Sequence, residues 1–127
     1  MAWFTGVNEK PKVQLIFSDN SGESFGLPIR IDANITLGRV DVALINANEA
    51  VVTWMEQFED ETLIQLLKVN SNGAKGDVVT LSKTNAERAS GFPQIEIFNN
   101  KVIAAMTMTE KDKPTKIKTV SVDLKNL

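Results

Sequence analysis

The stretch Val51-Val52-Thr53-Trp54-Met55 decides the fold, because its pattern recurs along the chain. Its residues are β-branched or bulky and apolar, which is typical of a buried β-strand. Ala2-Trp3-Phe4-Thr5 overlays Thr53-Trp54-Met55-Glu56 at an offset of 51 residues. The same offset carries Gly22 onto Gly73. Self-similarity at a fixed offset predicts a structural unit that is repeated along the chain.

Two further pairs of stretches repeat at nearly the same offset. Val51-Val52-Thr53-Trp54 overlays Ile103-Ala104-Ala105-Met106. Gly38-Arg39-Val40-Asp41-Val42 overlays Gly91-Phe92-Pro93-Gln94-Ile95. A period of about 50 residues that contains four short strands is the size of one β-propeller blade. The sequence therefore predicts an all-β fold of antiparallel four-stranded blades, and a β-sandwich of about ten strands is the alternative.

Short alternating apolar runs bounded by turn residues fill the chain, and helical spacing is nearly absent. Asn and Gly dominate the turns because they tolerate the positive φ that hairpin turns require. The segment 56–67 has some helix propensity, but the repeat predicts a strand there. The predicted strands lie at residues 12–17, 40–45, 50–55, 63–69, 78–81, 95–98, 102–108 and 117–122.

The expected strands group as three, four and three, which makes about two and a half blades of a propeller. We expect a single all-β domain over residues 1–127, with a partial blade at 1–34, a full blade at 35–86 and a partial blade at 87–127. On this interpretation the chain starts at the second strand of one blade and stops after the third strand of another.

The turn Ser18-Asp19-Asn20-Ser21-Gly22-Glu23-Ser24-Phe25 resembles the Asp-box, the S-x-D-x-G-x-T-W hairpin (BNR repeat) of sialidase-like β-propellers. Ser18, Gly22 and Phe25 match this pattern, as does the hydroxyl at position 24, whereas Asn20 stands where the pattern has Asp. The amide oxygen of Asn can accept hydrogen bonds from the backbone of the turn, and Gly supplies the positive φ. We expect the aromatic ring to fill space between strands.

Other stretches are similar to those of bacterial exo-sialidase-like propellers: residues 28–32, which run on to 37–42, and residues 87–93. With them the resemblance covers most of residues 2–108. It implies an arginine triad for the substrate carboxylate, a tyrosine nucleophile assisted by Glu, and an Asp acid/base. The chain has no Tyr and only Arg30, Arg39 and Arg88 as arginines. The catalytic set is incomplete, so we expect no catalytic residues in this chain.

The composition excludes several kinds of site and partner. Without His or Cys the chain has no imidazole or thiolate ligands, no disulfide and no His- or Cys-dependent catalysis. A net charge of -2 with scattered lysines argues against a nucleic-acid partner. No apolar run reaches the roughly 20 residues of a membrane span. We expect no metal, cofactor, nucleic-acid or membrane partner.

The first six residues show no signal-peptide pattern, and absence of cysteine does not place the protein in a compartment. The resemblance implies an extracellular or periplasmic parent protein, because propellers of this kind often occur in exported proteins.

Arg39, Asp41 and Arg88 are the candidate ligand-binding residues. Arg39 and Asp41 are two residues apart and share one face of an expected innermost strand. Arg88 lies in the connection that leads to the next innermost strand. A guanidinium group offers planar donors for a carboxylate or sugar hydroxyl. The alternative is an ion pair between neighbouring blades, which is the favoured interpretation.

Two other groups of residues have a functional and a structural interpretation. Trp3 and Trp54 are possible platforms for a sugar ring, but their recurrence in register favours core packing between blades. Glu56, Glu59, Asp60 and Glu61 carry oxygen ligands suited to Ca²⁺. The run lacks the Gly-spaced pattern of a dedicated calcium loop, so a solvated hairpin tip is favoured.

Two functional hypotheses follow. The first is a non-catalytic binding or scaffold module for a glycan or a protein partner. The second is a fragment of an exo-sialidase-like glycoside hydrolase, completed by other sequence or other subunits. An open arc of blades exposes strand edges and apolar faces, so we expect that the chain either self-associates through them or is part of a longer propeller.

Overall fold

A computed structural model describes residues 1–6, 8 and 10–127. The described chain is all-β, with one short 3-10 helix, η2 (Leu124–Asn126), after the last strand. Sheet A contains β1 (Ala2–Thr5), β2 (Lys12–Leu15) and β3 (Ile29–Arg30) in that order. Sheet B contains β4 (Ile35–Asn46), β5 (Glu49–Phe58), β6 (Glu61–Asn70) and β7 (Val79–Thr84). Sheet C contains β8 (Gly91–Phe98), β9 (Lys101–Met108) and β10 (Lys116–Asp123).

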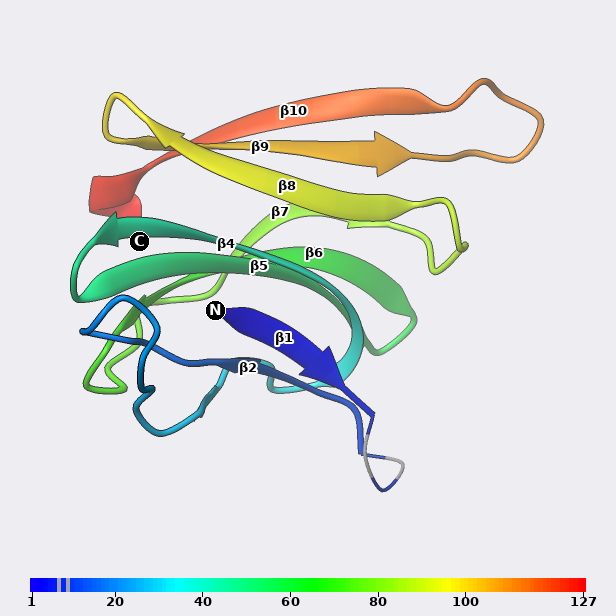
Figure 1. Ribbon diagram of the computed structural model, residues 1–127. Coiled ribbons are helices and arrows are strands. Elements are labelled where there is room, and N and C mark those ends of the chain that lie inside the picture. The colour runs from blue at the N-terminus through cyan, green and yellow to red at the C-terminus, as the bar shows by residue number, and fades with distance from the viewer. Residues whose placement is uncertain (7, 9) are drawn as a thin grey trace.

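The three antiparallel sheets are stacked, with sheet B between sheets A and C (Figure 1). None of them closes on itself, and each is built by hairpins between strands that follow one another in the sequence. The predicted all-β class is confirmed, as are the strands at all eight predicted runs and the grouping of three, four and three strands.

Strand pairing repeats between sheets A and B with the offset read from the sequence. In sheet A, Trp3 of β1 lies opposite Gln14 of β2. In sheet B, Trp54 of β5 lies opposite Gln65 of β6. β5 and β6 therefore repeat the pairing of β1 and β2 at an offset of 51 residues. The first overlay predicted from the sequence is confirmed. A slip of one residue in the pairing would turn every side chain to the other face of the sheet. The matching register therefore means that equivalent residues of the two sheets point to equivalent faces.

Strand pairing also repeats between sheets B and C, at offsets of 52 residues from β5 to β9 and 53 residues from β4 to β8. Val52 of β5 lies opposite Val42 of β4, and Ala104 of β9 lies opposite Ile95 of β8. The second and third overlays are thus confirmed. In the described residues sheet A has no counterpart of β4, and sheet C has none of β7.

A glycine at one place in the repeat lets neighbouring sheets approach closely. Gly38 of β4 and Gly91 of β8 both have positive φ, 76° and 84°, at a break in the pairing register. A Cβ on Gly38 would lie 2.9 Å from Cγ of Phe4, and one on Gly91 would overlap Sδ of Met55. Phe4 and Met55 are themselves repeat partners. β4 therefore packs on β1 of sheet A, and β8 packs on β5 of sheet B, each at a glycine with positive φ.

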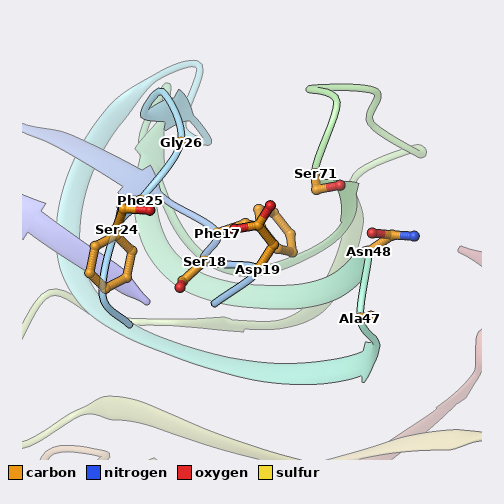
Figure 2. A pocket seen from close by; sticks show the side chains of 9 residues that line it. All are labelled: Phe17, Ser18, Asp19, Ser24, Phe25, Gly26, Ala47, Asn48 and Ser71. Atoms are coloured by element: carbon orange, nitrogen blue, oxygen red, sulfur yellow. The ribbon is translucent and has the colours of Figure 1, made fainter. Parts of the chain in front are cut away.

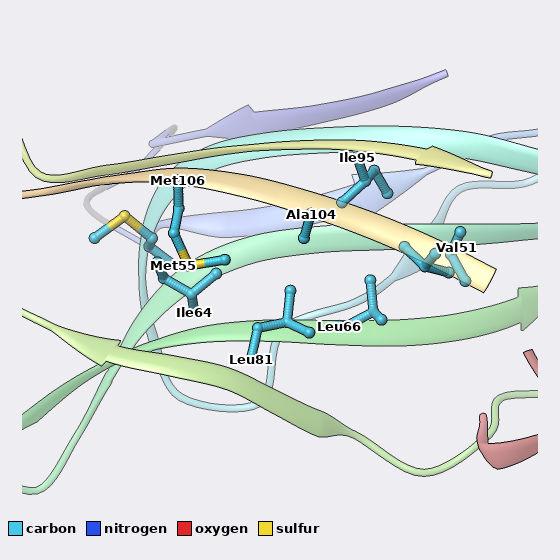
Figure 3. Packing of buried hydrophobic residues seen from close by; sticks show 9 residues of the cluster. Val51, Met55, Ile64, Leu66, Leu81, Ile95, Ala104 and Met106 are labelled. Atoms are coloured by element: carbon cyan, nitrogen blue, oxygen red, sulfur yellow. The ribbon is translucent and has the colours of Figure 1, made fainter. Parts of the chain in front are cut away.

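The core consists of two apolar layers, one on each face of sheet B. The layer between sheets A and B contains Val13, Leu15, Ile31, Ala50, Val52, Trp54, Leu67 and Val69. The layer between sheets B and C contains Val51, Met55, Ile64, Leu66, Leu81, Ile95, Val102, Ala104 and Met106 (Figure 3). Alternate residues of β5 thus face opposite sheets, which explains why this strand is apolar almost throughout.

Candidate functional site

Arg39 binds the backbone of the connection between β7 and β8. Its guanidinium donates to the carbonyl oxygens of Glu87 at 2.9 Å, Arg88 at 3.2 Å and Ser90. It also lies 4.7 Å from the ring centroid of Phe92. Partial burial lowers the pKa of Arg39 below its ordinary value, because the charged form loses hydration. The donors of Arg39 thus point at protein carbonyls.

Asp41 makes a second link from sheet B to sheet C. Its Oδ2 accepts the backbone N–H of Ile95 at 2.8 Å, and its Oδ1 accepts that of Val42 at 2.9 Å. The register break between Gly38 and Asp41 interrupts strict alternation in β4. Asp41 and Arg39 nevertheless both reach toward sheet C. They hold the two sheets together through backbone groups, whereas the sequence suggested a direct ion pair for this role.

Arg88 is exposed, and its carbonyl oxygen accepts from Arg39. The structure therefore brings Arg39 and Arg88 together at one loop, with Asp41 on the same side of sheet B. The role of these three residues in ligand binding stays a prediction.

The Asp-box-like turn is held by its own side chains. Oδ1 of Asn20 accepts the N–H of Ser24 at 2.9 Å and the hydroxyl of Ser18 at 3.0 Å. Nδ2 of Asn20 donates to Oγ of Ser24 at 2.7 Å, and Oγ of Ser18 accepts the N–H of Gly22 at 2.8 Å. Gly22 has a φ of 89°. Asn20 therefore accepts from the backbone as expected, and its amide group adds a donor that a carboxylate would lack.

Phe25 differs from the expectation for this turn. Its side chain does not fill space between strands: the residue is 48% exposed and lines a groove. The turn belongs to the long connection between β2 and β3, outside the paired residues of sheet A.

The groove lies between the Asp-box-like turn and two turns of sheet B (Figure 2). Phe17 and Asp19 lie between Phe25 on one side and Asn48 and Ser71 on the other (Figure 2). The cavity measures about 430 Å³ here and continues into an adjoining one of about 790 Å³. The adjoining part is lined mainly by apolar residues: Met1, Leu15, Ile16, Val42, Leu44, Ala47 and Ala50.

Sequence reasoning missed this groove. Its walls come from residues 1, 15–26, 42–50 and 71, which no local pattern connects. The N–H of Ser71 donates to the carbonyl oxygen of Asn48 at 2.8 Å and fixes the two turns of sheet B against each other. Among the described residues that line the groove, Asp19 has the only charged side chain. The only indication of the groove in the sequence is that Leu44 and Phe25 are large apolar residues close to turns.

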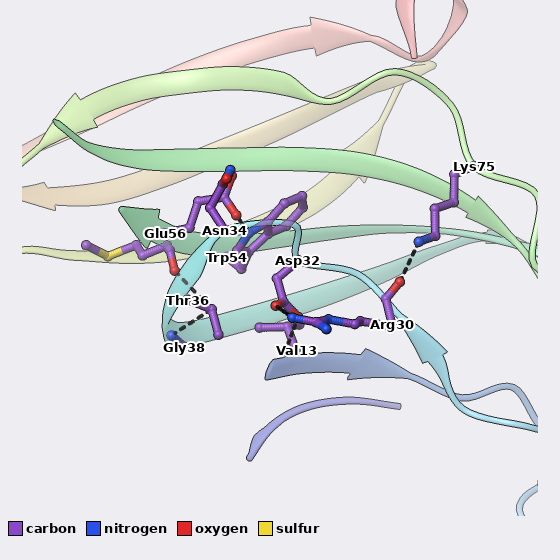
Figure 4. A network of polar contacts seen from close by, with 10 residues as sticks. Val13, Arg30, Asp32, Asn34, Thr36, Gly38, Trp54, Glu56 and Lys75 are labelled. Carbon is purple, nitrogen blue, oxygen red and sulfur yellow. Dashed lines mark hydrogen bonds and ion pairs between the residues drawn. The ribbon is translucent and has the colours of Figure 1, made fainter. Parts of the chain in front are cut away.

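A buried carboxylate lies inside the layer between sheets A and B (Figure 4). Glu56 is 2% exposed and accepts hydrogen bonds from Nε1 of Trp54 at 3.0 Å, Nδ2 of Asn34 at 3.2 Å and Nε2 of Gln65 at 3.3 Å. The sequence placed Glu56 in a solvated hairpin tip together with Glu59. That placement is wrong for Glu56, because β5 runs on to Phe58 and carries position 56 into the interior. Trp54 is core, as predicted.

Asp32 is the second buried carboxylate of this layer. It accepts the backbone N–H of Val13 and pairs with Arg30 at 2.9 Å. The hydrogen bond to Asp32 raises the pKa of Arg30, and its charge raises it further. Every buried side-chain nitrogen and oxygen in the described part of the chain has a hydrogen-bond partner. Asp32 and Glu56 thus stabilise the layer between sheets A and B through these hydrogen bonds.

The structure was also searched for metal-binding clusters and membrane-spanning helices. Among residues 1–6, 8 and 10–127, no three carboxylates gather closely enough to hold a metal ion. The same residues include no helix long and apolar enough to cross a membrane.

The chain was compared with protein-family models, with curated proteins and with solved structures, and none of the three comparisons gave a match.

Proposed function

We propose that this chain is a non-catalytic binding module built from propeller-type blades, and that the groove beside the Asp-box-like turn is its ligand site. The repeated strand register carries the architectural part of this proposal. A sandwich has no need for sheets that match residue by residue. A stack of equivalent blades requires it, together with the glycines at positions 38 and 91 that recur where sheets meet.

The groove supports a neutral glycan as the ligand. The phenyl rings of Phe17 and Phe25 offer flat apolar surfaces for the C–H face of a sugar ring. Asp19, Asn48 and Ser71 at the same groove offer acceptors and donors for sugar hydroxyls. An acidic sugar would meet the carboxylate of Asp19, and the N-terminal ammonium group of Met1 at the same groove already donates to the carbonyl oxygen of Ile16 at 2.9 Å.

The second hypothesis, a fragment of an exo-sialidase-like hydrolase, has less support. Such an enzyme needs guanidinium groups free to bind the substrate carboxylate. Arg39 donates to three carbonyl groups, and Arg30 pairs with Asp32, so only Arg88 among the arginines has no such internal contact in the described chain. The chain also lacks the tyrosine nucleophile.

Titration calorimetry with lactose, maltotriose and chitobiose tests the proposal, with sialyllactose as the acidic comparison. We expect at least one neutral glycan to bind more tightly than sialyllactose. Phe25→Ala should weaken this binding about tenfold, which corresponds to roughly 1.4 kcal/mol. Phe58→Ala is the matched control, because Phe58 is 48% exposed, as Phe25 is, and ends β5 on the side away from the groove.

Failure of all three neutral glycans to bind would overturn the glycan assignment. Tighter binding of sialyllactose would overturn the argument from Asp19 and favour the sialidase-like hypothesis. An equal effect of Phe25→Ala and Phe58→Ala would place the binding outside the groove.

A further inference from the structure

The two outermost faces of the stack occupy repeat positions that are buried inside the chain. On sheet C, Ile103 and Ile117 correspond to Val51 and Ile64, which sheet B buries against sheet C. With no sheet over them, Ile103 is 38% exposed and Ile117 is 68% exposed. We call this surface the Ile117 face; it includes Glu96, Phe98, Lys101, Ile103, Thr107, Ile117, Thr119 and Asp123.

Sheet A shows the complementary situation. Trp3 corresponds to Trp54, and Ile16 follows β2 where Leu67 stands in β6. Sheet B buries Trp54 and Leu67 against sheet A, whereas Trp3 and Ile16 are half-buried on the side away from sheet B. We call this surface the Trp3 face; it comprises Trp3, Lys12, Gln14, Ile16 and Arg30.

Inside the chain, each sheet places its Trp54-type face on the preceding sheet's Val51-type face. We infer that a second copy of this chain continues the stack, with its Trp3 face packed on the Ile117 face of the first copy. The contact is then a third occurrence of an interface that the chain already forms twice, and not a new kind of surface. This inference rests on the blade architecture proposed above and does not depend on the glycan groove.

Charge supports this pairing of faces. Glu96 lies opposite Ile103 and so belongs to the Ile117 face, where Lys101 and Asp123 offset each other. Lys12 lies opposite Thr5 and belongs to the Trp3 face, where Arg30, opposite Gln14, is offset by its pair with Asp32 and leaves Lys12 as the uncompensated charge. A cationic face meets an anionic one, which favours head-to-tail contact over contact between two identical faces.

The number of copies follows from the number of sheets. Each copy supplies three sheets, so a pair supplies six, within the range of about four to eight blades that propellers contain. Two copies can therefore close into a ring. Thr107 and Thr119 stand where the internal interface has Met55 and Leu66, so the contact is less apolar than the internal ones. We expect a dimer that dissociates on dilution.

Light scattering behind size exclusion, over a range of concentrations, tests the inference on the intact chain. We expect the mass to rise from one copy of 14.0 kDa to two and to stop there. Ile117→Glu and Gln14→Glu should each weaken the dimer at least tenfold, because each adds a charge to one face. Ile35→Glu is the control. Ile35 is 63% exposed at the start of β4 in sheet B, so it belongs to neither of the two outermost faces. Circular dichroism confirms that each variant is folded.

A mixture of the two variants gives the decisive result. Ile117→Glu keeps an intact Trp3 face, and Gln14→Glu keeps an intact Ile117 face, so the mixture should form a dimer through one contact. A monomer at every concentration would overturn the inference. A dimer that only Ile117→Glu disrupts would show two identical faces in contact and would also overturn it. Neither result would affect glycan binding, which is measured separately on the groove.

Discussion

The layer between sheets A and B and the layer between sheets B and C occupy the same positions of the repeat, yet they are stabilised differently. The first contains Trp54 and two buried carboxylates, Asp32 and Glu56. The second contains Met55 and Met106 and is reinforced by charged side chains that bind backbone groups across the sheets. A repeated backbone therefore tolerates different interiors, provided that volume is filled and buried polar groups are paired.

The strongest test of this difference removes the equivalent large residue from each layer. Trp54→Ala should lower the free energy of unfolding by about 3–5 kcal/mol, and Met106→Ala by about 2–5 kcal/mol. We expect the first value to be the larger, because loss of the indole also removes the donor to Oε2 of Glu56 and leaves only those from Asn34 and Gln65 to Oε1. Urea unfolding followed by circular dichroism measures both. A smaller effect for Trp54→Ala would show that the two layers do not differ in the way described.

A second test compares the two glycines at which sheets meet. Gly91→Ala should cost about 2–4 kcal/mol, from a left-handed backbone and from overlap with the buried Met55. Gly38→Ala should cost about 1–2 kcal/mol, because Phe4 is 44% exposed and can move away.

The double variant Gly91→Ala/Met55→Ala is the control for this overlap. If the overlap is real, its destabilisation should be less than the sum of the two single values. Additive values, or equal costs at the two glycines, would contradict the close contact of β8 with β5.

A third test concerns the link from Asp41 to β8. Asp41→Ala should cost about 1–3 kcal/mol, since the N–H of Ile95 loses its acceptor. Hydrogen exchange of the Ile95 amide should become faster, while amides of β2 in sheet A keep their rates. Asp41→Asn retains one acceptor oxygen and should cost less. Unchanged exchange at Ile95 would mean that Asp41 does not join the sheets.

Much of the fold could be predicted from the sequence because its signals are local. Alternation of apolar residues identified eight strands, and Asn and Gly identified their turns. The overlay of Trp3 on Trp54 gave the strand register of two sheets, because a repeat in sequence forces a repeat in pairing. The propeller-type assembly and the relation to sialidase-like proteins remain proposals built on that repeat.

The candidate site could be predicted only in part. The hydrogen bonds within the turn around Asn20 follow from neighbouring residues. Arg39 was recognised as an important cation, but its partners lie 48 to 51 residues further along the chain, and no local pattern identifies them. The groove beside Phe25 is likewise assembled from separate turns.

The sequence by itself determined the strands, their grouping and the repeat, because these depend on side-chain alternation and on backbone conformations that few residues adopt. Only the tertiary structure decided what the polar residues do. It buried Glu56 in one layer, used Arg39 and Asp41 to join two sheets, and left Phe25 open in a groove. The physical reason is that burial and hydrogen-bond partners are set by which distant segments stack together, a property that no short stretch of sequence contains.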